Sequence, residues 1–99
     1  MINNEINEKV NYWQNKGFIC EIWTSPPGGG WSDPGHEGDE VFIVLEGEME
    51  ISLEGNKYRP KIGEEFFVPA YKSHATLNTG KVTNRFYWIH SYKWSPTGS

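Results

Sequence analysis

The sequence predicts an all-β domain with one short helix at its start, and three observations lead to that prediction. Aromatic and β-branched residues dominate the apolar positions, with five each of Trp, Tyr and Phe but only three Leu. Such residues suit the pleated, half-buried surface of a sheet better than a helix. Eleven glycines and six prolines divide the 99 residues into short segments. Short strands at close spacing are typical of a β-sandwich or barrel, and the length fits one domain, residues 1–99.

The helix is expected over residues 3–16. Its apolar stripe consists of Ile2, Ile6, Val10 and Trp13. These positions recur at helical spacing, whereas Asn and Glu occupy the other faces. Gly17 can end the helix. Because most of its surface is polar, this helix must pack against the rest of the chain to persist.

After Gly17 the apolar period changes to two, as in strands. The expected strands are residues 18–23, 40–46, 48–53, 57–59, 65–68, 74–78 and 82–93. The barrel is therefore expected over about 18–94, with a disordered tail at 95–99. In the last strand Phe86, Trp88 and His90 share one face. Residues on its other face compete for the core, and the sequence does not decide between the two faces.

Charge and cysteine content exclude several classes of function. The net charge is −4, and no cluster of Lys and Arg offers a footprint for nucleic acid or an anionic membrane. No apolar stretch approaches the roughly 20 residues of a membrane span. The first ten residues lack the apolar run of a signal peptide. Cys20 is the one cysteine, so no internal disulfide forms, and a buried inert thiol is expected. A cytoplasmic protein is therefore expected.

Two histidines and a glutamate stand where loops lead into strands. His36 precedes Glu40 by four residues, and His74 follows a second loop that contains Pro69. Side chains two or four residues apart share a face of a strand, so His36 and Glu40 can point the same way. Asn78 likewise shares a face with His74. Two imidazoles and one carboxylate form the ligand set of many non-haem iron sites and suit other divalent metals.

The spacing of these residues resembles the two motifs of the cupin family. The first motif is matched by Gly28, His36, Glu40 and Gly47, and the second by Gly63, Pro69, His74 and Asn78. The resemblance covers residues 28–78, about half of the chain. It implies a double-stranded β-helix, or jelly-roll barrel, with one interior pocket for a small-molecule ligand. Pairing into a homodimer is also common in the family.

In metal-binding cupins the first motif supplies two histidines and a glutamate, and the second supplies one histidine. Here the resemblance implies only His36, Glu40 and His74 as ligands of a divalent transition ion such as Fe, Mn, Ni or Zn. Pro34 stands in the place of the first motif histidine and cannot ligate. Tyr71 stands in the place of a motif glycine.

The remaining expectations concern the pocket and its use. The further pocket residues are expected to be Trp31, Tyr71, Asn78 and His90. Trp31 is either a stacking platform for a ligand or a lid over the barrel rim, and His90 is either a replacement ligand or part of an aromatic core. No catalytic base is identified, although Tyr71 and His90 are candidates. Three functions stay open: an enzyme that uses a metal, a metal-free binding or sensing module, and a structural role through dimer formation.

Overall fold

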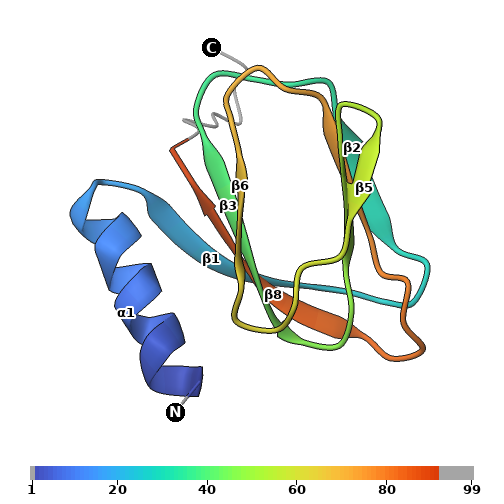
Figure 1. The fold of residues 1–99 in the computed structure, drawn as a ribbon, viewed down its shortest axis with the longest axis horizontal. Helices are drawn as coiled ribbons and strands as arrows, with labels where there is room; N and C mark the ends of the chain where they lie inside the picture. Colours follow the sequence, from blue (N-terminus) through green and yellow to red (C-terminus); the bar gives the residue numbers. More distant parts are fainter. Residues whose placement is uncertain (1, 92–99) are drawn as a thin grey trace, which may run out of the picture.

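The computed structural model describes residues 2–91, in which one helix precedes eight short strands (Figure 1). The helix is α1 (Ile2–Asn15). The strands are β1 (Ile19–Ser25), β2 (Gly30–Asp33), β3 (Glu40–Glu46), β4 (Glu50–Leu53), β5 (Asn56–Tyr58), β6 (Glu65–Val68), β7 (His74–Leu77) and β8 (Asn84–His90). The expected fold class, an all-β domain with a short N-terminal helix, is confirmed.

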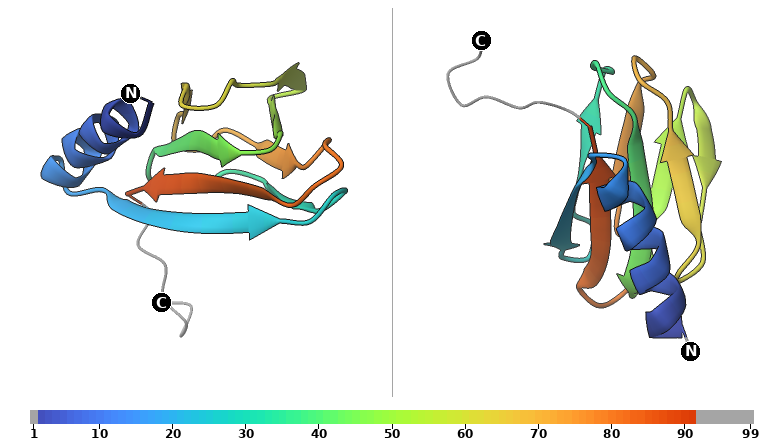
Figure 2. Two further views of the ribbon diagram at one scale, coloured as in Figure 1. Left: turned by 90° about the horizontal axis from the view of Figure 1, so that it is seen from below. Right: turned by 90° about the vertical axis from the view of Figure 1, so that its left-hand side faces the viewer.

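The strands form two antiparallel sheets that face each other. One sheet has the order β1-β8-β3-β6 and the other has the order β2-β7-β4-β5. The helix lies against the outer face of the first sheet (Figure 2). The first sheet is therefore covered on both faces, by the second sheet on one side and by the helix on the other. Strands β3 and β8 are its two central strands.

The core between the two sheets is built from alternate residues of facing strands. Its buried members are Phe42, Val44, Met49, Ile51, Val68 and Phe86. Trp31 and Trp88 pack against this core at one side. The register places Phe42 opposite Trp88 on the central strands. The face of β8 that carries Phe86, Trp88 and His90 therefore points toward the second sheet.

A second core lies between the helix and the first sheet. Its buried members are Ile6, Val10, Val41, Ile43 and Ile89. Residues Glu40–Val44 of β3 are all buried, which explains why this strand is apolar on both faces. Cys20 packs here, and its thiol lies 3.9 Å from the carbonyl oxygen of Val10. Burial raises the pKa of that thiol, in accord with the inert role expected for it.

Several strand boundaries differ from the sequence prediction by one or two residues, and larger differences occur at β2 and β8. The short strand β2 is absent from the expected strands and begins at the last of three consecutive glycines. It forms because Gly30 packs on the backbone of β7, where a Cβ atom would overlap the carbonyl oxygen of Thr76. Strand β4 begins two residues later than expected, after a turn in which Gly47 has a φ of 76°. Strand β8 spans Asn84–His90, and the expectations for residues 92–99 lie outside the described residues. Within residues 2–91 no helix is long and apolar enough to cross a membrane.

Candidate ligand-binding site

A cavity of about 370 Å³ opens between the two sheets. Its lining residues are Trp23, Trp31, Asp33, His36, Glu40 and Trp88. They come from β1, β3 and β8 of one sheet, from β2 of the other, and from the loop between β2 and β3. The cavity has the size of known small-molecule sites, with three indole rings on its walls and three polar side chains converging at one end.

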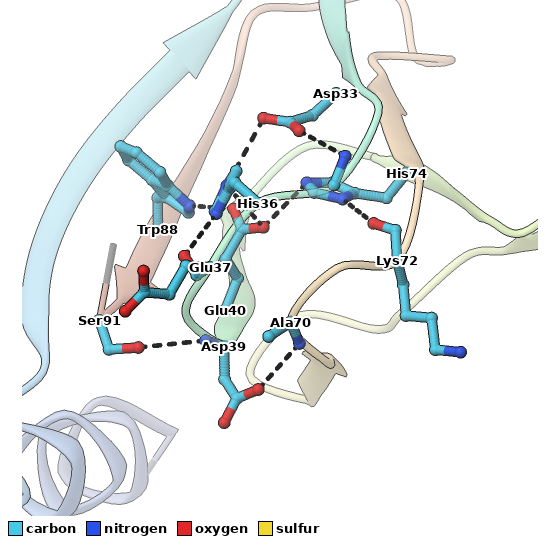
Figure 3. Close-up of polar contacts among 11 residues, drawn as sticks. Asp33, His36, Glu37, Asp39, Glu40, Ala70, Lys72, His74, Trp88 and Ser91 are labelled. Atoms are coloured by element: carbon cyan, nitrogen blue, oxygen red, sulfur yellow. Dashed lines mark hydrogen bonds and ion pairs between the residues drawn. The ribbon is translucent and has the colours of Figure 1, made fainter. Parts of the chain in front are cut away.

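The carboxylate of Glu40 is the centre of that polar end (Figure 3). Glu40 is the first residue of β3 and is 2% exposed. Its Oε1 accepts a hydrogen bond of 2.7 Å from the indole Nε1 of Trp88, on the adjacent strand. Its Oε2 lies 3.0 Å from Nε2 of His74 and 3.4 Å from Nε2 of His36. A buried carboxylate needs such neighbours because its desolvation is costly.

Strand pairing and loop geometry deliver the two histidines. His74 begins β7 and pairs with Asp33 at the end of β2. His36 lies in the following loop, where Gly35 has a φ of 109° and donates its backbone N–H to Oδ1 of Asp33 at 2.7 Å. The carbonyl oxygen of His36 accepts the N–H of Tyr71 at 2.9 Å. These contacts fix both imidazoles beside Glu40.

Each imidazole uses its Nδ1 for a backbone carbonyl. His36 Nδ1 donates to the oxygen of Glu37 at 2.9 Å, and His74 Nδ1 donates to the oxygen of Lys72 at 3.0 Å. A carbonyl oxygen can only accept, so each Nδ1 carries a proton. In the neutral form of each ring Nε2 is then an acceptor. Both Nε2 atoms nevertheless face the carboxylate of Glu40, which is also an acceptor.

Asp33 adds a fourth acceptor to this group. Its Oδ2 lies 3.5 Å from Nε2 of His36. The Nε2 of His74 is buried and has no hydrogen bond, although the Glu40 oxygen is 3.0 Å away. Four acceptor atoms at such distances repel one another unless a positive charge lies among them. A proton, a metal ion or a cationic group of a ligand can each supply that charge.

The pKa of His74 shows that a proton can do so. Burial by itself would lower the pKa of this imidazole. The contact with Glu40, the backbone oxygen of Lys72 and the negative charges of Glu40 and Asp33 together outweigh burial, and they raise the pKa above its usual range. The imidazolium form of His74 beside the Glu40 carboxylate is therefore favoured by its surroundings.

The structure brings together His36, Glu40 and His74, as the motif spacing predicts, and it places Trp31 on the cavity wall. Trp31 stacks on Phe86 with ring centroids 5.8 Å apart, so one of its faces belongs to the core. The other three expected pocket residues lie elsewhere.

Tyr71 is 71% exposed and adopts a φ of 65° in a turn. Asn78 is buried, but it is used by backbone groups at the far end of β7. It donates to the carbonyl oxygens of Ser25 and Val82 and accepts from the N–H of Gly80. Tyr71 and Asn78 are therefore part of the loop framework and do not line the cavity.

His90 is buried one layer behind the cavity wall. Its ring stacks on Trp88 with centroids 3.8 Å apart, and its Nε2 lies 3.7 Å from Oε2 of Glu21. Glu21 in turn accepts the indole N–H of Trp23 at 2.9 Å. Of the two alternatives for His90, the contacts favour a role in the aromatic packing that supports Trp88.

Sequence reasoning missed three lining residues: Trp23, Asp33 and Trp88. Trp88 and Trp23 come from β8 and β1, whose pairing decides which side chains reach the cavity. The sequence did indicate a place for Asp33 near the site, because this residue immediately precedes the proline that replaces the motif histidine.

The donors at the polar end have the chemistry of a transition-metal site but not its arrangement. Ligating histidines usually donate their other ring N–H to a carbonyl or carboxylate, as His36 and His74 do. As the side chains lie, however, residues 2–91 contain no group of three or more His, Cys, Asp or Glu side chains that could hold a metal ion.

Comparisons with known proteins agree with this fold and motif pattern. A family model described as "Cupin domain" matches residues 21–90. Among curated proteins, "Endoribonuclease YbeY" of Myxococcus xanthus is 44% identical over 59 residues, which are 58% of this chain and 19% of that protein. The chain thus spans about a fifth of that relative's length.

Solved cupin structures share the architecture. The Schizosaccharomyces pombe Cnp3 cupin domain has a TM-score of 0.70 and 25% identity, and the match covers 77% of this chain and 56% of that one. A Cupin_2 domain of an XRE family transcriptional regulator from Enterobacter cloacae has a TM-score of 0.71 and 20% identity, with 82% and 87% covered. The double-stranded barrel expected from the motifs is therefore confirmed.

Proposed function

Since the chain belongs to the cupin domain family, we propose that it binds a small organic ligand in the cavity between its two sheets. The ligand's polar group lies against Asp33, His36 and Glu40, and its apolar body lies among the indole rings of Trp23, Trp31 and Trp88. One observation carries the proposal: two carboxylates and an imidazole, those of Asp33, Glu40 and His36, converge at the end of an aromatic cavity. Interior arrangements of this kind cost stability unless a bound group uses them.

The indole N–H groups provide a direct test by two-dimensional ¹H–¹⁵N NMR. A library of small polar aromatic fragments, added to the protein in chelator, should shift the indole signals of Trp23, Trp31 and Trp88. The signal of Trp13 should stay fixed, because its indole bonds to Glu65 on the helix side of the sheet. Fragments that shift Trp13 as much as Trp88, or that shift no indole, would contradict the proposal.

The Glu40→Gln variant tests the polar end separately. It keeps the shape of the side chain but removes the negative charge that faces both imidazoles. Fragment affinity should fall about tenfold or more, since contacts to a buried charge are worth roughly 1.5–3 kcal/mol. The matched control is Glu46→Gln, because the side chain of Glu46 is 64% exposed and lies outside the cavity.

A divalent transition metal at the polar end is the second candidate, and the two Nδ1 contacts to backbone carbonyls favour it. His36, Glu40 and His74 would hold the ion, which would supply Lewis acidity toward a ligand oxygen. Titration of chelator-treated protein with Zn²⁺ in a calorimeter decides the matter. Binding of one Zn²⁺ per chain that is lost in His74→Gln and kept in His90→Gln would support a metal site. The absence of binding heat would favour the metal-free pocket.

A further inference from the structure

The electrostatics of the cavity identify the class of ligand. None of its lining residues is Lys or Arg, whereas two are carboxylates, Asp33 and Glu40. A ligand carboxylate or phosphate would therefore meet negative charge without a guanidinium or ammonium to pair with. A positively charged ligand would instead be attracted, because two carboxylates and two imidazole Nε2 atoms face the polar end of the cavity.

Two of the three indole N–H donors on the cavity wall already bond to carboxylates. The indole N–H of Trp88 donates to Glu40, and that of Trp23 donates to Glu21. The remaining polar atoms at the end are acceptors when the imidazoles are neutral, since both Nδ1 atoms donate to backbone carbonyls. When the imidazoles are neutral, a ligand that brings its own N–H donors can satisfy these acceptors.

The indole rings are held in place before any ligand arrives. Trp88 is stacked on His90, and the Trp23 ring meets it edge-on at 6.2 Å and 74°. Trp31 is stacked on Phe86 at 5.8 Å. Rigid indole faces attract cations through the ring quadrupole, and a desolvated site strengthens that attraction. Pre-organised rings also lower the entropic cost of binding.

We propose that the ligand of this cavity is a small organic cation, an amine that is protonated at neutral pH and carries an apolar or aromatic body. The ammonium lies at the end formed by Asp33, His36 and Glu40, and the body lies among the three indoles. This inference rests on the proposed function, because it names the ligand class of the same cavity.

Three probes that share one ring and differ in one polar group test the proposal: benzylamine, benzyl alcohol and benzoate. Their affinities are measured by calorimetry and indole NMR in chelator, at a mildly alkaline pH where benzylamine is still charged. Benzylamine should bind tightest, benzyl alcohol about tenfold or more weakly, and benzoate not detectably. The difference in affinity between benzylamine and benzyl alcohol should decrease as salt is added, because the carboxylate of Asp33 is partly exposed and salt screens its charge.

Asp33→Asn isolates the contribution of charge. This variant should weaken benzylamine binding severalfold and benzyl alcohol binding far less, and Glu46→Gln should change the affinity of neither probe. Benzyl alcohol or benzoate binding as tightly as benzylamine would overturn the inference. If benzoate binds only after Zn²⁺ is added, the proposed cationic ligand class is ruled out, whereas the proposed ligand-binding function is retained. If none of the three probes shifts the cavity indoles with or without Zn²⁺, the proposed function fails as well.

Discussion

The indole of Trp88 and the carboxylate of Glu40 make a buried charge-assisted hydrogen bond. Its contribution to stability can be measured by comparison with the exposed hydrogen bond between Trp13 and Glu65. Trp88→Phe removes the N–H that lies 2.7 Å from Oε1 of Glu40. We expect a loss of about 1.5–3 kcal/mol in the free energy of unfolding, because a buried carboxylate loses a donor. Trp13→Phe removes an equivalent bond to the exposed Glu65 and should cost under about 1 kcal/mol. Urea denaturation gives the loss in the free energy of unfolding for both variants. Equal losses would mean that the buried hydrogen bond contributes no more than the exposed one.

The raised pKa of His74 makes stability depend on pH in a definite direction. The folded protein binds this proton more tightly than the unfolded chain, where the pKa is close to 6.5. The extra stability is therefore complete below that value and is lost as the pH rises through the higher pKa of the folded state. The free energy of unfolding of the wild type, minus that of His74→Gln, should decrease from mildly acidic to alkaline pH in chelator. A difference that stays constant would mean that His74 does not hold the proton.

At the scale of elements, β2 depends on the absence of a side chain at Gly30. A Cβ atom there would overlap the carbonyl oxygen of Thr76 on β7. Gly30→Ala should therefore displace β2 and lower the free energy of unfolding by about 1–3 kcal/mol. Because Trp31 follows directly, its near-ultraviolet circular dichroism should change as well. Gly17→Ala is the control, since open space surrounds that position and only its φ of 90° opposes a side chain.

Sequence periodicity could predict the elements whose apolar pattern is local. Ile6 and Val10 form a helical stripe, and they do bury against the sheet. Strand β3 is apolar on both faces, and both faces are covered. The strand β2 could not be predicted in this way, because a glycine followed by Trp, Ser and Asp has no apolar alternation. Its existence depends on a backbone contact with a strand more than forty residues later.

The residues of the candidate site could likewise be predicted from the sequence only in part. His36, Glu40 and His74 follow from motif spacing around turn residues such as Gly47 and Gly63, which do adopt positive φ values. Trp23 and Trp88 could not be assigned, because alternation shows which residues share a face but not which face turns inward. That choice is made by the helix, which covers the face of β8 that carries Ile89.

At the scale of the whole molecule, the open edge of β1 predicts self-association. Among the described residues β1 pairs only with β8, and it contains neither Pro nor Lys to protect its other edge. It exposes Ile19, Ile22 and Trp23. Antiparallel pairing of two copies about Ile22 would set Glu21 opposite Trp23 and not opposite another carboxylate, so the edge is self-complementary.

We therefore expect a dimer that dissociates on dilution, detected by light scattering coupled to size-exclusion chromatography. Ile22→Lys should yield a monomer, because it places a charge on the pairing strand. Leu77→Lys, at a similarly exposed apolar position in the other sheet, should leave the mass unchanged. A wild-type protein that stays monomeric at high concentration would rule out the pairing.

The doubly covered first sheet has a consequence for how the cavity opens. Glu40 and Trp88 lie on its central strands, whereas Trp31 and Asp33 lie on β2, a four-residue strand at the edge of the other sheet. Amide protons on β3 and β8 should exchange with deuterium only through global unfolding, and those of β2 and residues 34–39 through cheaper local opening. A ligand that fills the cavity should slow the second group selectively. We therefore expect the ligand to enter by local opening of β2 and residues 34–39, while β3 and β8 keep their positions.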